Sequence, residues 1–316
     1  MNQEQYLKNL TAPTAKIDVV LDTDAYNEID DQFAISYMLN CGDKINIKGI
    51  CAAPFFNKKA SSPKDGMEKS YNEILKLLDL AKRSELKSIV FKGSERFMEE
   101  TKTAEDEKNP IESPAADFIA GLAENYSPQN PLYIVAIGAI TNVASAILKN
   151  PNIKENCVIV WLGGHAFHIP NAGTEFNMGH DKAAARIVFG SGAPVVLLPC
   201  YGVVDCLTTS KYEMEHWLKG KNALCDYLYT NTVSTAEAYA KDKPWTRVIW
   251  DVSAIAWLFN QDGRFMREKL VPAPILEYDH TYAVNSHSHL IKYVYKIDRD
   301  AIFEDLFKRL AGEKDN

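Results

Sequence analysis

The spacing of hydrophobic positions changes once near the amino terminus. A short, β-branched, mostly apolar run at residues 17–21 is typical of a buried strand, and it ends at Asp22. From Ile29 onward, apolar residues recur at steps of three and four, at Phe33, Ala34, Tyr37 and Met38. This second pattern predicts an amphipathic helix that ends where Asn40 and Gly42 offer a stop. The segment therefore predicts a strand, a polar loop and a helix.

Strand-like and helix-like segments alternate along the rest of the chain. Apolar runs typical of strands lie at 45–57, 88–93, 132–137, 157–162, 194–199 and after 288. Helical patterns lie between them, and such alternation predicts a parallel sheet covered on both faces, with right-handed crossovers. We expect a single large, doubly wound α/β domain over residues 1–316, in which 1–15 form an N-terminal extension. The active site is expected at the carboxyl ends of the strands.

Composition and charge exclude several classes of partner. The 316 residues carry 35 Lys and Arg against 42 Asp and Glu, a formal net charge of −7, and no basic tract suited to a nucleic acid backbone. The first residues lack the apolar core of a signal peptide, and no apolar stretch approaches the length of a membrane span. We therefore expect a soluble, cytoplasmic protein. Its six cysteines contain no C-x-x-C pair, which argues against a disulfide framework or a thiolate metal site.

Five carboxylates crowd the loop between the first strand and the first predicted helix: Asp22, Asp24, Glu28, Asp30 and Asp31. The helix dipole and free backbone N–H groups stabilise anions in a first helical turn, which accounts for the last two acids only. Several oxygen donors at the carboxyl end of a strand, without Cys or His, are what a hard cation such as Ca²⁺ or Mg²⁺ prefers. The loop therefore predicts a metal site.

Several segments, in order along most of the chain, resemble the inosine–uridine-preferring nucleoside hydrolases. These are Ca²⁺-dependent enzymes that cleave the N-glycosidic bond of ribonucleosides. The segment DTDAYNEIDDQFA resembles their opening motif D-x-D-P-G-x-D-D-A, with two residues inserted and no Pro-Gly. The segments IGAITNVASAIL and TEFN resemble the family's G-P-L-T-N-x-A and A-E-F-N motifs, and VIWD resembles its late acidic motif, usually His-Asp. The resemblance implies the family's fold and activity.

The resemblance also implies a role for each matching residue. The Ca²⁺ ligands would be three carboxylates and one main-chain carbonyl, from Asp24, Asp31, Asp251 and Ile137. A water held by Ca²⁺ and Asp24 would attack the anomeric carbon, with Asp24 as the base. The side chains expected to hold the sugar are Asp30 for the 2′-hydroxyl, and Glu175, Asn177 and Asn171 for the 3′- and 5′-hydroxyls. The implied substrate is a small-molecule nucleoside, and the family's members imply a homo-oligomer, a dimer or a tetramer.

Departures from the family pattern concentrate around the leaving group and the pocket rim. Trp250 stands where many members have a His that protonates the departing base, and members with Trp there prefer purines. Trp250 therefore favours purine nucleosides through stacking, while a purely core-filling role stays open.

Where the family often has Gly-Asn after its second strand, this chain has Phe55, Phe56 and then Asn57, so one usual partner of the ribose and metal is expected to be missing or displaced. The loop between Gly164 and Glu175 is also shorter than in the family. Tyr26, Asn27 and Glu28 have no counterpart in the family motif and are expected to reshape the pocket.

Two histidine pairs raise the alternative of a zinc site. His165 and His168 have H-x-x-H spacing in the loop that precedes TEFN, and His287 and His289 would share one face of a strand. Neither pair has a second motif nearby, so we interpret them as core or loop histidines rather than zinc ligands. A contact between His165 or His168 and a leaving base stays open.

Two other functions remain possible at this stage. The DTD segment also matches the start of the phosphohydrolase pattern D-x-D-x-T, although Tyr26 stands in the place of the Thr. A non-catalytic, Ca²⁺-dependent protein that binds nucleosides or sugars would keep the same acids. Trp245 and Arg247 belong either to a mobile lid or to a surface loop.

Overall fold

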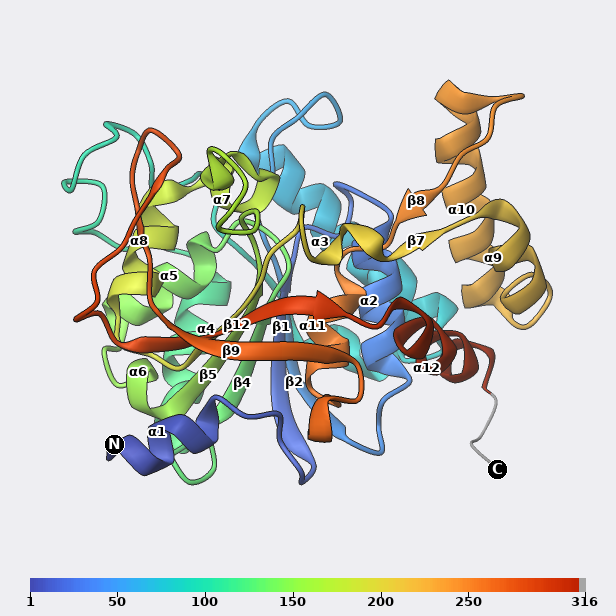
Figure 1. Cartoon of the computed structure of the whole chain (residues 1–316). Helices are drawn as coiled ribbons and strands as arrows, with labels where there is room; N and C mark the ends of the chain where they lie inside the picture. The colour runs from blue at the N-terminus through green and yellow to red at the C-terminus, as the bar shows by residue number, and fades with distance from the viewer. Residues whose placement is uncertain (313–316) are drawn as a thin grey trace.

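The computed structural model describes residues 1–312, which are built around one eight-stranded sheet (Figure 1). The strand order is β3-β2-β1-β4-β5-β6-β12-β9. All neighbours pair in parallel except β9, which is antiparallel to β12 at one edge. The strands are β1 (Ile17–Thr23), β2 (Ile45–Ala52), β3 (Val90–Lys92), β4 (Leu132–Ala136), β5 (Cys157–Leu162), β6 (Val195–Leu198), β9 (Met266–Pro272) and β12 (Leu290–Ile297). The predicted α/β class with a mostly parallel sheet is confirmed.

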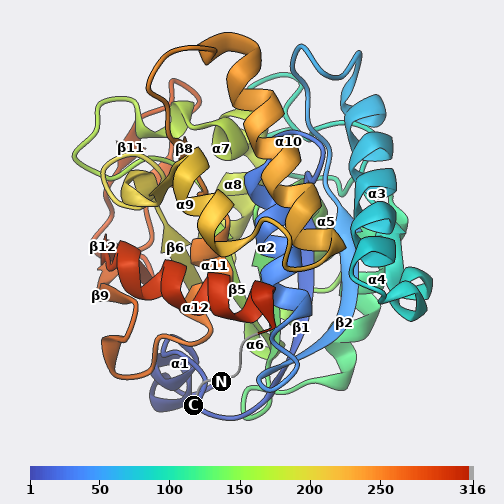
Figure 2. The ribbon, with the colours of Figure 1, turned by 90° about the vertical axis from the view of Figure 1, so that its right-hand side faces the viewer.

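Helices cover both faces of the sheet (Figure 1). One layer contains α2 (Asp30–Leu39), α3 (Pro63–Leu80), α10 (Ala223–Ala240), α11 (Val252–Trp257) and α12 (Arg299–Ala311), and Figure 2 looks onto it. The other layer contains α4 (Pro114–Leu122), α5 (Thr141–Lys149) and α8 (Lys182–Gly190). Each layer forms its own hydrophobic core. Val19 and Leu21 belong to the first core and Val20 to the second, because successive side chains of a strand point to opposite faces.

Smaller elements complete the described chain. They are the helices α1 (Gln3–Asn9), α6 (Ile153–Asn156), α7 (Phe176–His180) and α9 (Lys211–Trp217), and the strand pairs β7 (Thr208–Thr209) with β8 (Arg247–Val248) and β10 (Ile275–Leu276) with β11 (Tyr282–Ala283). Helix α1 lies in the expected N-terminal extension, and the Tyr6 hydroxyl donates to the Leu290 carbonyl at 2.8 Å. Within residues 1–312, no helix combines the length and apolar character needed to span a membrane.

Helix α2 is buried on all sides, which contradicts the expected amphipathic helix. Every residue from Asp30 to Leu39 is buried, because α3, α10, α11 and α12 contact the side of α2 that would otherwise face solvent. Its polar side chains find partners inside the protein. The Asn231 amide donates to Gln32 Oε1 at 2.7 Å, and the Ser36 hydroxyl donates to the Gln32 carbonyl at 2.6 Å. Helix α2, which carries Asp30 and Asp31 in its first turn, is therefore held in place by its neighbours.

The direction of chain progression across the sheet reverses between β1 and β4. From β1 the chain proceeds outward to β2 and β3, and it then returns to the other side of β1 as β4. The Ile137 N–H, just after β4, donates to the Asp22 carbonyl in β1 at 2.9 Å. Such a reversal opens a crevice at the carboxyl ends of the strands, where ligands of α/β proteins bind. The acidic loop after β1 and the residues after β4 therefore meet at this crevice.

Asp181 joins three segments beside the second helical layer. Its buried carboxylate caps α8 and accepts hydrogen bonds from the Met98 and Glu99 amides, at 2.8 and 3.2 Å. It also accepts one from the Thr141 hydroxyl at 2.6 Å and one from the Ala184 amide at 3.2 Å. Burial raises the pKa of Asp181 to about 6. One side chain thus anchors the long 93–113 loop to α5 and α8.

We expect Asp181→Ala to lower the free energy of unfolding by about 2–4 kcal/mol, because it leaves several buried donors without an acceptor. Denaturant titration followed by circular dichroism measures this loss. The control is Asp117→Ala, whose carboxylate is mostly exposed and pairs with Lys149 at the surface. That change is expected to cost less than about 1 kcal/mol. Equal losses in the two variants would contradict an anchoring role for Asp181.

Candidate active site

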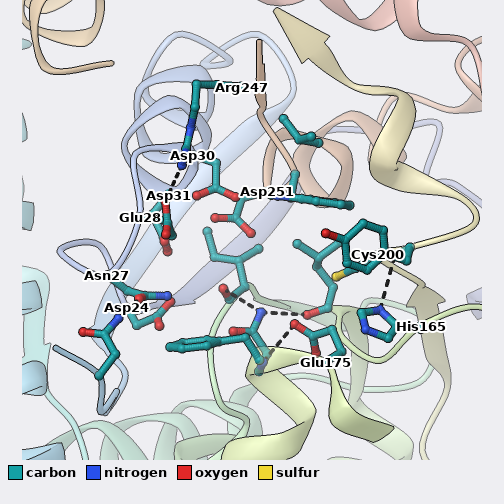
Figure 3. Close-up of a pocket in the computed structure, with 18 of the residues that line it drawn as sticks. Asp24, Asn27, Glu28, Asp30, Asp31, His165, Glu175, Cys200, Arg247 and Asp251 are labelled. Carbon is teal, nitrogen blue, oxygen red and sulfur yellow. Dashed lines mark hydrogen bonds and ion pairs between the residues drawn. The ribbon is translucent and has the colours of Figure 1, made fainter. Parts of the chain in front are cut away.

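A pocket of about 420 Å³ opens at the carboxyl ends of the strands (Figure 3). This volume lies within the ~300–1,000 Å³ typical of small-molecule sites. Its walls come from the loops after β1, β2, β4, β5 and β6, from α7 and from the segment before α11. The lining residues are Asp24, Asn27, Glu28, Asp30, Asp31, Asn57, Ile137, Leu162, His165, Glu175, Phe176, Asn177, Cys200, Tyr201, Thr246, Arg247, Val248, Trp250 and Asp251.

The structure brings together all but one of the residues to which the family resemblance assigns a role. Asp24, Asp30, Asp31, Ile137, Glu175, Asn177, Trp250 and Asp251 all line the pocket. The exception is Asn171, which is exposed, has a left-handed backbone (φ 53°) and precedes a short 3₁₀ turn. Its carbonyl accepts the Thr174 amide at 2.9 Å. The shortened loop therefore places Asn171 outside the pocket.

Local hydrogen bonds fix the acids of the first loop. The Asp24 carbonyl accepts the Asn27 amide at 2.7 Å, which closes a tight turn directly after β1. Asp30 and Asp31 then occupy the first turn of α2, as predicted. The Thr23 hydroxyl donates to Asp31 Oδ1 at 2.5 Å and so orients that carboxylate. These contacts direct three acids into one small volume.

Four aspartates in the pocket have almost no contact with solvent. Their exposed fractions are 1% for Asp24, 5% for Asp30, 1% for Asp31 and 3% for Asp251. Burial raises the pKa of all four, and mutual repulsion raises the pKa of Asp24, Asp30 and Asp251 further. The pKa of Asp31 rises to about 7. Ionising these four carboxylates together is therefore costly unless a positive charge lies among them.

The donor set fits a hard divalent cation. Carboxylate oxygens of Asp30, Asp31 and Asp251 lie within 4.8 Å of one another. Both carboxylate oxygens of Asp24 are buried and have no hydrogen-bond partner among the described residues. The nearby Arg247 guanidinium pairs with Glu28 at 2.5 Å. Oxygen donors in this number suit Ca²⁺ or Mg²⁺ better than a softer metal.

The opposite side of the pocket is formed by the start of α7. Glu175 caps this helix and accepts the backbone amides of Asn177, Met178 and Gly164 at 2.8–2.9 Å. The Asn177 side chain donates to the carbonyls of Ile137 and Leu162 at 3.2 and 3.1 Å. A carbonyl oxygen has two lone pairs, so Ile137 keeps one for a cation. These bonds fix the side chains of Glu175 and Asn177 relative to the acids.

The rim contains residues whose roles the sequence did not reveal. Asn57 lines the pocket and donates through its amide to Asn27 Oδ1 at 2.7 Å, although the altered second loop predicted a missing or displaced polar partner. Arg247 joins β8 to the first loop through Glu28, so it belongs to the pocket rather than to a detached surface loop. The only signal for Arg247 was its position four residues before Asp251.

The first histidine pair separates in the structure, and the second lies before β12 rather than on the expected strand. His165 lines the pocket and His168, three residues later, is exposed outside it. Within residues 1–312, the only cluster with metal-ligand spacing consists of the three aspartates, and no histidine belongs to it.

The fold and the pocket together define a class of protein. An α/β sheet with a buried cluster of carboxylates at its switch point is typical of metal-dependent enzymes that act on small polar substrates. The family described as inosine-uridine preferring nucleoside hydrolase matches residues 19–304. This chain belongs to that family, as the sequence motifs indicated.

Individual curated relatives match half of this chain or less. A non-specific ribonucleoside hydrolase of Escherichia fergusonii is 29% identical over 167 residues, which are 50% of this chain and 50% of that protein. An uncharacterised protein of Schizosaccharomyces pombe is 35% identical over 91 residues, 28% of this chain and 29% of that protein. The chain therefore spans half or less of the curated relatives that it matches.

Solved structures share the fold over nearly the whole chain. A plant nucleoside hydrolase superposes with a TM-score of 0.74 at 19% identity, covering 93% of this chain and 99% of the other. A purine-preferring ribonucleoside hydrolase from Gardnerella vaginalis gives 0.70 at 22% identity, with 93% and 98% covered. At such identities the likeness establishes the architecture alone.

We expect a bound cation to raise the melting temperature, and to do so more at high pH. Burial raises the pKa of Asp31 to about 7, from about 4 in an unfolded chain, and it also raises the pKa of Asp24, Asp30 and Asp251. Without a cation, the stability that protonation of these groups provides is complete below about pH 4 and is lost as the pH rises through about 7. A cation requires ionised ligands, so it stabilises most above that pH.

Thermal unfolding at about pH 5.5 and about pH 8, with Ca²⁺ or with a chelator, measures this linkage. The difference between the two conditions is taken at each pH, because partly buried histidines such as His180, whose pKa is lowered by burial, affect stability equally with and without the cation. A shift of the same size at both pH values would contradict proton-linked binding at these acids.

Proposed function

We propose that this protein hydrolyses the N-glycosidic bond of ribonucleosides, with a preference for purines. The observation that carries the proposal is Asp24, a buried carboxylate with both oxygens unpartnered, which faces a pocket of nucleoside size. Membership of the nucleoside hydrolase family supports the same reaction class.

The proposed cofactor is Ca²⁺, held by Asp24, Asp31, Asp251 and the Ile137 carbonyl. When bound, the cation supplies positive charge that offsets the buried carboxylates and makes water in the site more acidic. The clustering of Asp30 with Asp31 and Asp251 places a further carboxylate beside these ligands. We assign Asp30 to the 2′-hydroxyl of the sugar, as the resemblance implied.

The proposed reaction is a displacement at the anomeric carbon. Asp24 accepts a proton from the attacking water, because neither of its carboxylate oxygens is engaged in another hydrogen bond. Glu175 and Asn177, fixed by backbone hydrogen bonds, hold the 3′- and 5′-hydroxyls. A positioned ribose reaches the oxocarbenium-like transition state with less reorganisation. Asn171 has no part in this proposal, because it lies outside the pocket.

We propose that Trp250 stacks on the purine. Its ring is half-buried and lines the pocket, and it meets the Tyr201 ring edge to face with centroids 5.4 Å apart. An indole held in this way offers a flat surface to a bicyclic base. The homo-oligomeric state and the cytoplasmic location stay predictions.

Asp24→Asn is expected to lower kcat by ~10²–10⁴-fold, because the amide cannot accept the proton of the attacking water. The assay follows reducing sugar released from inosine and uridine in Ca²⁺. The matched control is Asp79→Asn, the same change at an exposed surface carboxylate, which should leave kcat unchanged. Near-normal turnover by Asp24→Asn would remove the proposed base.

The same assay separates the competing functions. Release of phosphate from p-nitrophenyl phosphate, without sugar release from nucleosides, would favour the phosphohydrolase. Nucleoside binding seen by calorimetry, with no sugar released, would favour the non-catalytic binding protein. Sugar release from nucleosides supports the hydrolase.

Trp250→Leu is expected to reduce kcat/KM for inosine roughly 5–10-fold more than for uridine, because stacking is worth more to the larger ring system. Trp217→Leu is the control, since Trp217 stacks on Phe307 away from the pocket. Steady-state kinetics on both nucleosides gives the ratio. An equal loss on the two substrates would mean that Trp250 fills the core without selecting the base.

A further inference from the structure

Three rings from distant segments form one wall of the pocket. His165 follows β5, Tyr201 follows β6 and Trp250 precedes α11. The centroids of His165 and Tyr201 are 4.9 Å apart, and those of Tyr201 and Trp250 are 5.4 Å apart. We call His165, Tyr201 and Trp250 the aromatic wall. Its one imidazole, that of His165, can donate a hydrogen bond.

The proton position on the His165 ring follows from its hydrogen bond. The Tyr201 backbone amide donates to His165 Nδ1 at 3.3 Å, a contact drawn in Figure 3. Because Nδ1 accepts, the ring proton of the neutral imidazole is on Nε2. Partial burial lowers the pKa of His165, which keeps the ring neutral. Among residues 1–312, no atom accepts a hydrogen bond from Nε2.

His165 lies across the pocket from the proposed base. In Figure 3, Asp24 and His165 lie on opposite sides of the pocket, with Asp251 above and Glu175 below the space between them. In a displacement at carbon, the leaving group departs from the face opposite the attacking water. If the attacking water lies beside Asp24, to which it gives its proton, the nucleobase therefore leaves on the side of His165.

We propose that His165 is a catalytic residue, whose Nε2–H donates a hydrogen bond to the departing base. The inference rests on the proposed glycosidic reaction and adds the group that stabilises its leaving group. The C–N bond breaks with its electron pair on the base, while water oxygen bonds to the anomeric carbon and its proton passes to Asp24. The base takes up a proton from solvent as it leaves, and Asp24 returns its proton to solvent.

This role differs from that of a histidine at the late acidic motif. Trp250 occupies that position and provides a stacking face, so the donor comes from the loop after β5 instead. Charge on the base develops only in the transition state. A donor aimed at this charge therefore affects kcat more than KM.

The test compares two leaving groups on the same sugar. His165→Leu is expected to lower kcat on inosine by roughly 100-fold with little change in KM, the cost typical of removing one such donor. On p-nitrophenyl riboside, whose leaving group is stable as an anion, the same variant should keep kcat within about threefold of the unaltered protein. His165→Gln keeps an N–H near the position of Nε2 and should restore part of the activity on inosine.

His168→Leu is the matched control, because His168 lies in the same loop outside the pocket, and it should act like the unaltered protein on both substrates. Equal losses by His165→Leu on inosine and on p-nitrophenyl riboside would mean that His165 holds the sugar or the loop, and would overturn the inference. No loss on either substrate would overturn it as well. If the unaltered protein released no sugar from any nucleoside or from the riboside, the proposed function would fail and this inference with it.

Discussion

Repulsion among four buried aspartates is the constraint on which this structure depends. Two carboxylates that approach within a few ångströms repel strongly once water is excluded, and Asp24, Asp30, Asp31 and Asp251 are almost completely excluded from water. Such an arrangement opposes folding. It persists because hydrophobic cores on both faces of the sheet fix the backbone that carries the acids. The site therefore stores unfavourable energy, which a cation can relieve.

The topology explains how these acids come from opposite ends of the chain. Asp24 follows β1, and Ile137 follows β4, the strand next to β1 on the other side of the switch point. Asp251 precedes α11, and α11 packs against α2, which carries Asp30 and Asp31 in its first turn. Each donor thus stands at the end of a buried element rather than on a free loop. The positions of the donors are consequently set by the packing of the core.

The sequence was informative where a local pattern determines the structure. The alternation of strand-like and helical segments predicted the fold class, and the density of acids between β1 and α2 predicted the centre of the pocket. It failed where tertiary contacts decide. The apolar residues of α2 recur at helical steps, but they are spread around the whole helix, and four other helices cover it and satisfy Gln32 internally. The antiparallel edge strand β9 was missed, because its partly exposed residues lack a clear apolar run.

Loop residues were the least predictable part of the site. Asn171 belongs to a motif by order along the chain, but the shortened loop turns it out to solvent. Asn57 was expected to be displaced, yet it lines the pocket. In both cases the side chain's position depends on how a loop closes against other loops. A single sequence contains no local signal for that closure.

The departures from the family's motifs form one physical unit. The inserted Asn27 accepts the amide of Asn57 from the altered second loop, and its carbonyl accepts Lys59 Nζ at 2.6 Å. The inserted Glu28 pairs with Arg247 from β8. The first loop, through Asn27 and Glu28, therefore links Asn57 of the second loop to Arg247 near the late motif. Because these contacts lie at the rim while the acids lie at the base, the rim can change which substrate enters without moving the groups that would bind the cation.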